Sequence, residues 1–159
     1  MKDQLSPSAR RVQEVLENLG VGGRVTEMST TTRSAQDAAR AVGCEVGQIC
    51  KSLVFKGVSS HKGILVVASG ANRVNEKELS RFLGEPILKA DADFVRQATG
   101  FAIGGVPPVG RPQPLAVFID EDLFRYAEIW AAAGTPQAVF QLTPQELQRI
   151  TGGQVVCLK

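Results

Sequence analysis

The first strong pattern in the chain is a stripe of apolar residues at helical spacing between residues 7 and 20. The stripe consists of Val12, Val15, Leu16 and Leu19. Ser6 can cap this helix, Pro7 suits its first turn, and Gly20 suits its end. The pattern therefore predicts an amphipathic helix that packs one face against the rest of the chain.

Capping residues predict four further helices. The segments 34–43, 75–84 and 91–100 each begin at Ser, Asn or Asp and end at glycine. Polar side chains of this kind accept hydrogen bonds from the first N–H groups of a helix, and glycine readily ends one. The fourth helix is expected after Thr143, where Glu146 completes a capping box.

Apolar runs bounded by turn residues predict strands. The segments 49–57 and 63–70 are expected to form an antiparallel hairpin around a short polar turn. Shorter strands are expected at 23–28, 115–120, 128–134, 138–142 and 154–158. Because strands outnumber long helices and their connections are mixed, we expect an α+β fold with a mixed, curved or barrel-like sheet. The length suits a single domain spanning 1–159.

Composition excludes several classes of protein. With 43% apolar and 21% charged residues, the chain is expected to be an ordinary globular protein. The three cysteines form no CxxC pair and His61 is the single histidine, so neither a zinc site of the usual spacing nor histidine-dependent nucleophilic catalysis is expected. The phosphate-binding GxGxxG and P-loop patterns are absent, which argues against nucleotide hydrolysis. We therefore expect neither a metal nor a cofactor.

Charge, hydropathy and cysteine content limit the expected cellular location and binding partners of the protein. The net charge of +2 is too small to indicate nucleic-acid binding by itself, and it does not forbid it. There is no run of about 18 apolar residues, so a membrane span is not expected. An odd number of cysteines without a signal peptide favours a reducing cytoplasm.

The segment 99–114 holds four of the 16 glycines and four of the eight prolines. Such a segment cannot be an ordinary helix or central strand, because glycine is conformationally permissive and proline lacks the N–H that a ladder requires. It is expected to be a shaped loop. Taken alone, it is explained by a surface connection or by a site where a ligand approaches the backbone at Gly104 and Gly105.

The predicted strand 49–57 carries a lysine, Lys51, among apolar residues. Alternation places it with Ile49, Leu53 and Phe55 on one face, and the other face is also largely apolar. A strand that is apolar on both sides is expected to be covered on both sides. Because desolvating an ammonium is costly, Lys51 either reaches solvent at a strand end or lines a polar pocket.

These segments together resemble the YbaK/prolyl-tRNA-synthetase-associated editing-domain family. The likeness runs from about Thr30 to Leu147, through ICKSLVF, VNEKELSRFLG, GFAIGGVPPVG and IDEDLFRYAEIWAAAG in the same order. The resemblance implies an α+β domain with a mixed, highly curved (barrel-like) sheet and flanking helices, and hydrolysis of the ester bond of mischarged aminoacyl-tRNA. It also implies a cytoplasmic, trans-acting enzyme of translation fidelity. Its expected partners are the 3′ end of aminoacyl-tRNA and in some cases a synthetase, with neither DNA nor a membrane.

The resemblance also assigns residues. Lys51 matches the family's essential lysine, the loop around Gly104 and Gly105 matches its substrate loop, and Ser52 matches a position that is commonly Thr or Ser. Synthetases cannot strongly reject a smaller amino acid by binding alone, which explains the need for a second, hydrolytic site.

Ester hydrolysis needs an oriented water and stabilisation of the charge that develops on the carbonyl oxygen. Backbone N–H groups suited to this task belong to Ile103, Gly104, Gly105 and Val106, whereas Pro107 has no N–H and stiffens the loop. Lys51 is expected to place a cation near the terminal adenosine's phosphate or the ester oxygen. A role as a base would require a strongly lowered pKa, so electrostatic positioning is favoured.

Two other segments contain candidate substrate contacts. Thr32 precedes a predicted helix, where it could meet a nucleotide phosphate, although capping explains it equally well. Gly134 begins the turn 134–136, which resembles free-standing branches of the family that act on small amino acids such as alanine. Ala132 falls where the cysteinyl-tRNA type carries serine, which puts that subtype in doubt.

Two alternative functions stay open at this point. One is a binding module that recognises an aminoacyl-nucleotide, a tRNA or a synthetase without hydrolysis, and the other is hydrolysis of a different small acyl ester or amide. The acidic trio 120–122 is interpreted as solvated or capping, and Trp130 as core or pocket wall.

Overall fold

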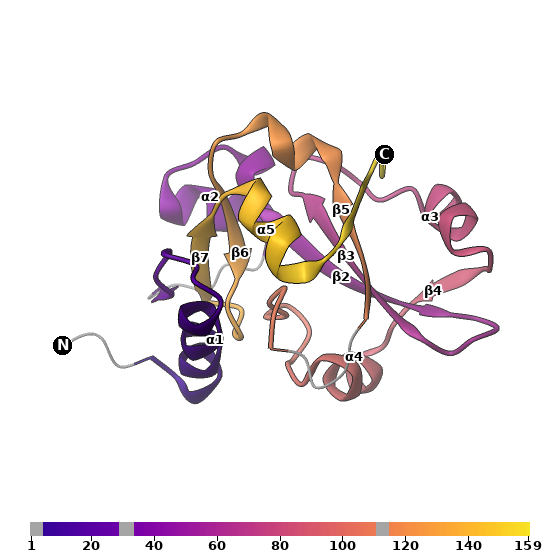
Figure 1. Ribbon diagram of the computed structural model, residues 1–159, viewed down its shortest axis with the longest axis horizontal. Coiled ribbons are helices and arrows are strands. Elements are labelled where there is room, and N and C mark those ends of the chain that lie inside the picture. Colours follow the sequence, from indigo (N-terminus) through magenta and orange to yellow (C-terminus); the bar gives the residue numbers. More distant parts are fainter. Residues whose placement is uncertain (1–4, 29–33, 111–114) are drawn as a thin grey trace.

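The structure is a computed structural model that describes residues 5–28, 34–110 and 115–159. Its described strands pair in two sheets, one of five strands in the order β4-β2-β3-β5-β8 and one of three in the order β1-β7-β6 (Figure 1). The strand bounds are β1 Thr26–Glu27, β2 Cys50–Gly57, β3 Gly63–Ser69, β4 Ile87–Lys89, β5 Ala116–Asp120, β6 Ile129–Ala132, β7 Ala138–Leu142 and β8 Gln154–Val156.

Five α-helices and two 3-10 helices complete the described part of the chain. Their bounds are α1 Pro7–Asn18, α2 Ala35–Val42, η1 Val46–Gln48, α3 Glu76–Leu83, α4 Ala92–Thr99, η2 Glu121–Arg125 and α5 Pro144–Thr151. The predicted N-caps of all five α-helices are confirmed, since each cap side chain accepts a hydrogen bond from a backbone N–H of the first turn. Local sequence therefore specifies where these helices begin.

The predicted α+β class and mixed sheet are confirmed. Strands β2, β3 and β4 pair antiparallel, whereas β3, β5 and β8 pair parallel. Closure into a barrel is not confirmed, because the pairings of the described strands define two separate sheets. Strand β4 was not predicted, because it has only three residues, Ile-Leu-Lys, which are too few to show a strand pattern.

The central hairpin β2–β3 is buried on both faces, as predicted. Cys50, Val54 and Leu65 belong to one apolar cluster, which also receives the apolar stripe of α1. Phe55 and Ile64 belong to a second cluster on the other face, which includes Leu79 of α3 and Ile87 of β4. The first half of β2 is less completely covered, because residues 51–53 are only partly buried.

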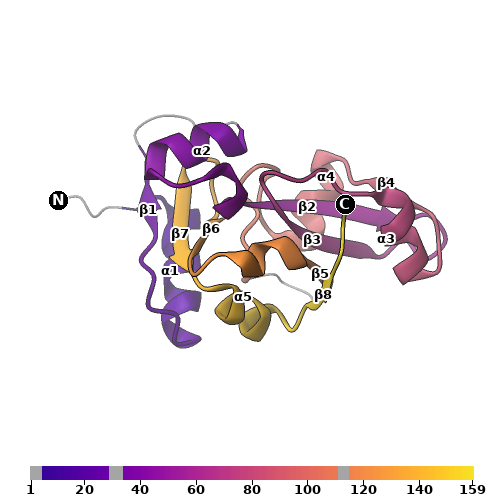
Figure 2. The same ribbon diagram turned by 90° about the horizontal axis from the view of Figure 1, so that it is seen from above.

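The two sheets meet where β2 begins. Ile49 forms an isolated parallel bridge with Trp130 of β6. Figures 1 and 2 show α1 beside the three-stranded sheet, while α3 and β4 lie at the remote end of the five-stranded sheet. The junction between the sheets is thus formed by the start of β2, the start of α2 and β6.

Core packing gives the first prediction. Phe140 of β7 is fully buried in the apolar cluster that also contains the stripe of α1, whereas Phe82 is 46% exposed. We expect Phe140→Ala to lower the free energy of unfolding by about 3–5 kcal/mol, because the remaining cavity is only partly refilled. Phe82→Ala removes the same atoms and is the matched control. Equal losses for the two variants in urea unfolding would contradict this account of the core.

Candidate functional site

A cavity of about 560 Å³ lies at the junction of the two sheets. Its walls are the β2 segment 50–53, residues 130–132 of β6, the beginning of α2 and part of the loop 103–106. Of the predicted site residues, Lys51, Ser52, Ile103, Gly104 and Val106 line it. The volume is suited to a small molecule or to the end of a larger one.

The cavity exists because one edge of β2 is only partly paired. Strand β4 pairs with β2 from Phe55 to Gly57, and Ala90 donates one further hydrogen bond to the carbonyl of Val54. Among the described strands, no pairing on this side covers the preceding residues of β2. Because hydrogen-bonding groups alternate between the two edges of a strand, the main chain of Ser52 lies on the same open edge as that of Val54.

Lys51 is half-buried at the cavity wall. Its Nζ donates a hydrogen bond of 2.6 Å to the backbone carbonyl of Asn72, in the loop after β3. Burial lowers the pKa of Lys51, the neighbouring cation Arg73 lowers it further, and Asp120 opposes both effects. Lys51 therefore lines a pocket and is held there by a fixed acceptor.

Ser52 provides the second polar group of this wall. Its Oγ is buried and has no hydrogen-bond partner among the described residues. Buried hydroxyl groups are almost always hydrogen-bonded, so an unpaired one that lines a cavity is suited to a polar atom of a ligand.

The glycine–proline loop divides into a part that faces the cavity and a part that supports it. Ile103 is 58% exposed and Gly104 adopts a φ of 91° at the cavity. The N–H of Gly105 instead donates to the carbonyl of Ala102, and a Cβ at Gly105 would lie 2.7 Å from the backbone of Thr135. The predicted backbone donor at Gly105 is therefore already engaged, and this glycine packs against the turn beyond β6.

The remaining predicted contacts lie elsewhere. Gly134 is buried, its N–H donates to the carbonyl of Gly105, and it supports the loop from behind. Pro107 is buried outside the residues that line the cavity. Thr32 lies outside the described residues. Trp130 lines the cavity, in agreement with its interpretation as a pocket wall.

The acidic trio 120–122 was expected to be solvated or to cap a helix. Asp120 caps η2 by accepting a 2.9 Å hydrogen bond from the N–H of Asp122, so capping is confirmed. Of the two alternatives, Asp120 takes capping and not solvation, because this carboxylate is only 1% exposed. Asn72, which holds Lys51, was not predicted at all, because nothing in its local sequence distinguishes it from an ordinary loop residue.

The described residues contain no group of three or more side chains suited to a metal ion. Within the same part of the chain, no helix is long and apolar enough to cross a membrane.

Comparison with known proteins identifies the relatives of this chain. The family model described as the aminoacyl-tRNA editing domain matches residues 29–150. A solved structure of a candidate trans-editing enzyme for prolyl-tRNA synthetase has a TM-score of 0.93 and 53% sequence identity, and the match covers 98% of this chain and 99% of that one.

Two curated bacterial proteins are also similar. The uncharacterized protein YwhH of Bacillus subtilis is 31% identical over 131 residues, which cover 82% of this chain and 83% of YwhH. EbsC of Enterococcus faecalis, a candidate Cys-tRNA(Pro)/Cys-tRNA(Cys) deacylase, is 26% identical over 122 residues, which cover 76% of this chain and 74% of EbsC.

The support behind the loop gives the second prediction. Gly134 has a φ of 101°, and a Cβ there would lie 2.8 Å from the backbone oxygen of Ser8. Gly84 is the control, because it has a φ of 74° and no atom lies within 4 Å of a Cβ added there. Gly84→Ala therefore measures only the cost of placing alanine in the left-handed region, about 1–2 kcal/mol. We expect Gly134→Ala to cost about 1–3 kcal/mol more in chemical denaturation, because the α1 backbone has to move. A smaller loss for Gly134→Ala than for Gly84→Ala would contradict this packing role.

Proposed function

The chain belongs to the aminoacyl-tRNA editing-domain family, and we propose that it hydrolyses the ester bond of mischarged aminoacyl-tRNA as a trans-acting deacylase. One observation carries the proposal. Lys51 and Ser52 of β2 and the exposed loop at Gly104 line the same cavity, although the strand and the loop lie about 50 residues apart in the chain. A cavity of this size accommodates an aminoacyl-adenosine end and leaves the tRNA body outside.

The proposed mechanism is attack by a water molecule on the ester carbonyl. Lys51 is a cation at the wall, where it attracts the phosphate of the terminal nucleotide or the oxygen on which negative charge develops. A fixed charge is effective there because it needs no reorientation during the reaction. The main chain at Gly104 approaches the substrate closely because no side chain intervenes.

The other walls suggest the class of amino acid. Ala131, Ala132, Ala138 and Val139 give the cavity a surface of small apolar side chains. Such a surface suits a small amino acid, and the alanine at 132 offers no hydroxyl where the cysteinyl-tRNA type has serine. The similarity to a candidate trans-editing enzyme for prolyl-tRNA synthetase makes mischarged tRNA(Pro) the first substrate to test.

The activity is tested with purified protein and a panel of mischarged tRNAs, beginning with tRNA(Pro) that carries alanine or cysteine. We expect free amino acid to be released from at least one member of the panel. Binding of tRNA or of a synthetase without turnover on any member would overturn hydrolysis and support the binding-module alternative. Turnover of aminoacyl-adenosine analogues at the rate of the intact tRNA would instead indicate a general small-ester hydrolase.

Removal of the cavity's cation gives the third prediction. We expect Lys51→Ala to lower kcat/KM for deacylation by about 100-fold or more, because the site loses its preorganised charge. Lys51→Arg keeps the charge but not its geometry, so it should retain only part of the activity. Lys62→Ala, in the exposed turn between β2 and β3, is the control. Wild-type rates in Lys51→Ala would rule out this mechanism.

The unpaired hydroxyl gives the fourth prediction. We expect Ser52→Ala to leave the unfolding midpoint unchanged, because the free protein loses no hydrogen bond. With substrate bound, the lost hydrogen bond should lower kcat/KM by about two- to tenfold. Ser59→Ala, on the exposed turn after β2, is the matched control. A loss of stability without a change in kcat/KM would assign Ser52 to packing.

A further inference from the structure

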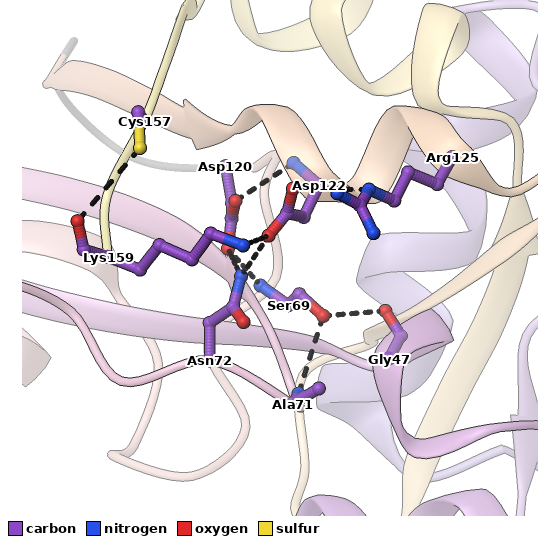
Figure 3. Close-up of polar contacts among 9 residues, drawn as sticks. All are labelled: Gly47, Ser69, Ala71, Asn72, Asp120, Asp122, Arg125, Cys157 and Lys159. Atoms are coloured by element: carbon purple, nitrogen blue, oxygen red, sulfur yellow. Dashed lines mark hydrogen bonds and ion pairs between the residues drawn. The ribbon is translucent and has the colours of Figure 1, made fainter.

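A buried polar network lies where β3 and β5 end side by side (Figure 3). It includes Asn72, whose backbone carbonyl accepts the hydrogen bond from Lys51. Asp120 is 1% exposed and accepts three hydrogen bonds. The donors are the N–H of Ser69 at 3.0 Å, the side-chain amide of Asn72 at 2.9 Å and the N–H of Asp122 at 2.9 Å. A buried carboxylate is costly unless its oxygens are satisfied, so this arrangement fixes the loop that follows β3.

Asn72 is held on three sides within this network. Its side-chain amide donates to Oδ2 of Asp120 and to Oδ2 of Asp122 at 2.8 Å, as Figure 3 shows. Its backbone N–H donates to the carbonyl of Ser69 at 3.0 Å. Its backbone carbonyl accepts the 2.6 Å hydrogen bond from Lys51. The position of that acceptor is therefore set by the two carboxylates and the end of β3.

We infer that Asp120 and Asn72 are positioning residues that orient the Lys51 ammonium in the cavity. Asp120 anchors the Asn72 side chain, and the Asn72 carbonyl then anchors Lys51. This inference deepens the proposed function and rests on it, since the orientation of Lys51 matters for catalysis only if Lys51 acts on the substrate.

The charges around Lys51 give Asp120 a second effect. The groups that influence Lys51 are Arg73 from the loop after β3, Lys89 from β4 and Asp120 from β5. The two cations lower the pKa of Lys51 and add to the effect of burial, whereas Asp120 raises it. No ion pair joins Asp120 to another described residue, so its charge remains available to favour the protonated form of Lys51.

Unlike Asp120, the carboxylate of Asp122 is paired with cations. Asp122 forms ion pairs with Nζ of Lys159 at 2.9 Å and with Nε of Arg125 at 3.4 Å (Figure 3). These contacts lower the pKa of Asp122. The two carboxylates therefore have different partners. Asp122 is paired with cations at the surface, whereas Asp120 contacts the loop that holds Lys51.

The first test titrates Lys51 directly in the free protein, by NMR of lysine labelled with ¹³C at Cε. The Lys51 signal is assigned by its loss in Lys51→Arg. We expect Asp120→Asn to lower the pKa of Lys51, because the anion that favours the ammonium is removed. Asp91→Asn, which makes the same change at the N-cap of α4, is the matched control and should leave the titration unchanged.

The second test removes the side-chain amide of Asn72, which fixes the loop, and keeps the charge of Asp120. We expect Asn72→Ala to lower kcat for deacylation about tenfold or more with a smaller change in KM, because Lys51 loses its fixed orientation. Asn72→Ser retains a donor and should recover part of the loss. Asn75→Ala, at the N-cap of α3, removes an equivalent side chain outside the network and should keep wild-type kinetics.

The outcomes separate this inference from the proposed function. If the pKa of Lys51 is the same in Asp120→Asn as in the wild type, the inference is overturned whether or not the protein deacylates tRNA. If the titration shifts as expected but the wild type hydrolyses no mischarged tRNA, the catalytic meaning of the network is overturned together with the proposed function. Should Asp120→Asn fail to fold, the kcat of Asn72→Ala and its recovery in Asn72→Ser decide the question.

Discussion

The hydrogen bond between the Lys51 ammonium and the Asn72 carbonyl is the interaction on which the candidate site depends. A lysine on a strand with two covered faces cannot simply extend into solvent, and leaving its charge without a partner would be costly. The loop after β3 supplies the partner, and the two carboxylates behind that loop keep it in place. The charge is thereby held at the wall of a cavity where a substrate can meet it.

The cavity itself follows from incomplete strand pairing. Strand β2 is paired on one side along its length, but β4 covers only the far end of its other side. The start of β6 approaches through a single bridge at Ile49, and the loop 103–106 closes part of the remaining space. An open strand edge within an otherwise dense core thus becomes a candidate binding surface, because its polar main-chain groups are not used by the sheet.

Much of the fold could be predicted from local sequence. The N-caps of the α-helices and the central hairpin depend on residues close together in the chain, so short-range chemistry specifies them. Strand β4 could not be predicted, because its pairing with β2 and not its own composition makes it a strand. The burial of Asp120 was missed for a similar reason, since a carboxylate after a strand is ordinarily solvated unless a distant loop covers it.

The candidate site shows the same division. The sequence alone determined that Lys51 lies on a strand with two apolar faces and that residues 99–114 form a shaped loop, because both properties are local. Only the tertiary structure decided that Gly104 faces the cavity while Gly105 and Gly134 support the loop, and that Asn72 holds Lys51. The physical reason is that these roles depend on which backbone atoms lie within about 3 Å of one another, and such distances between remote segments are set by packing.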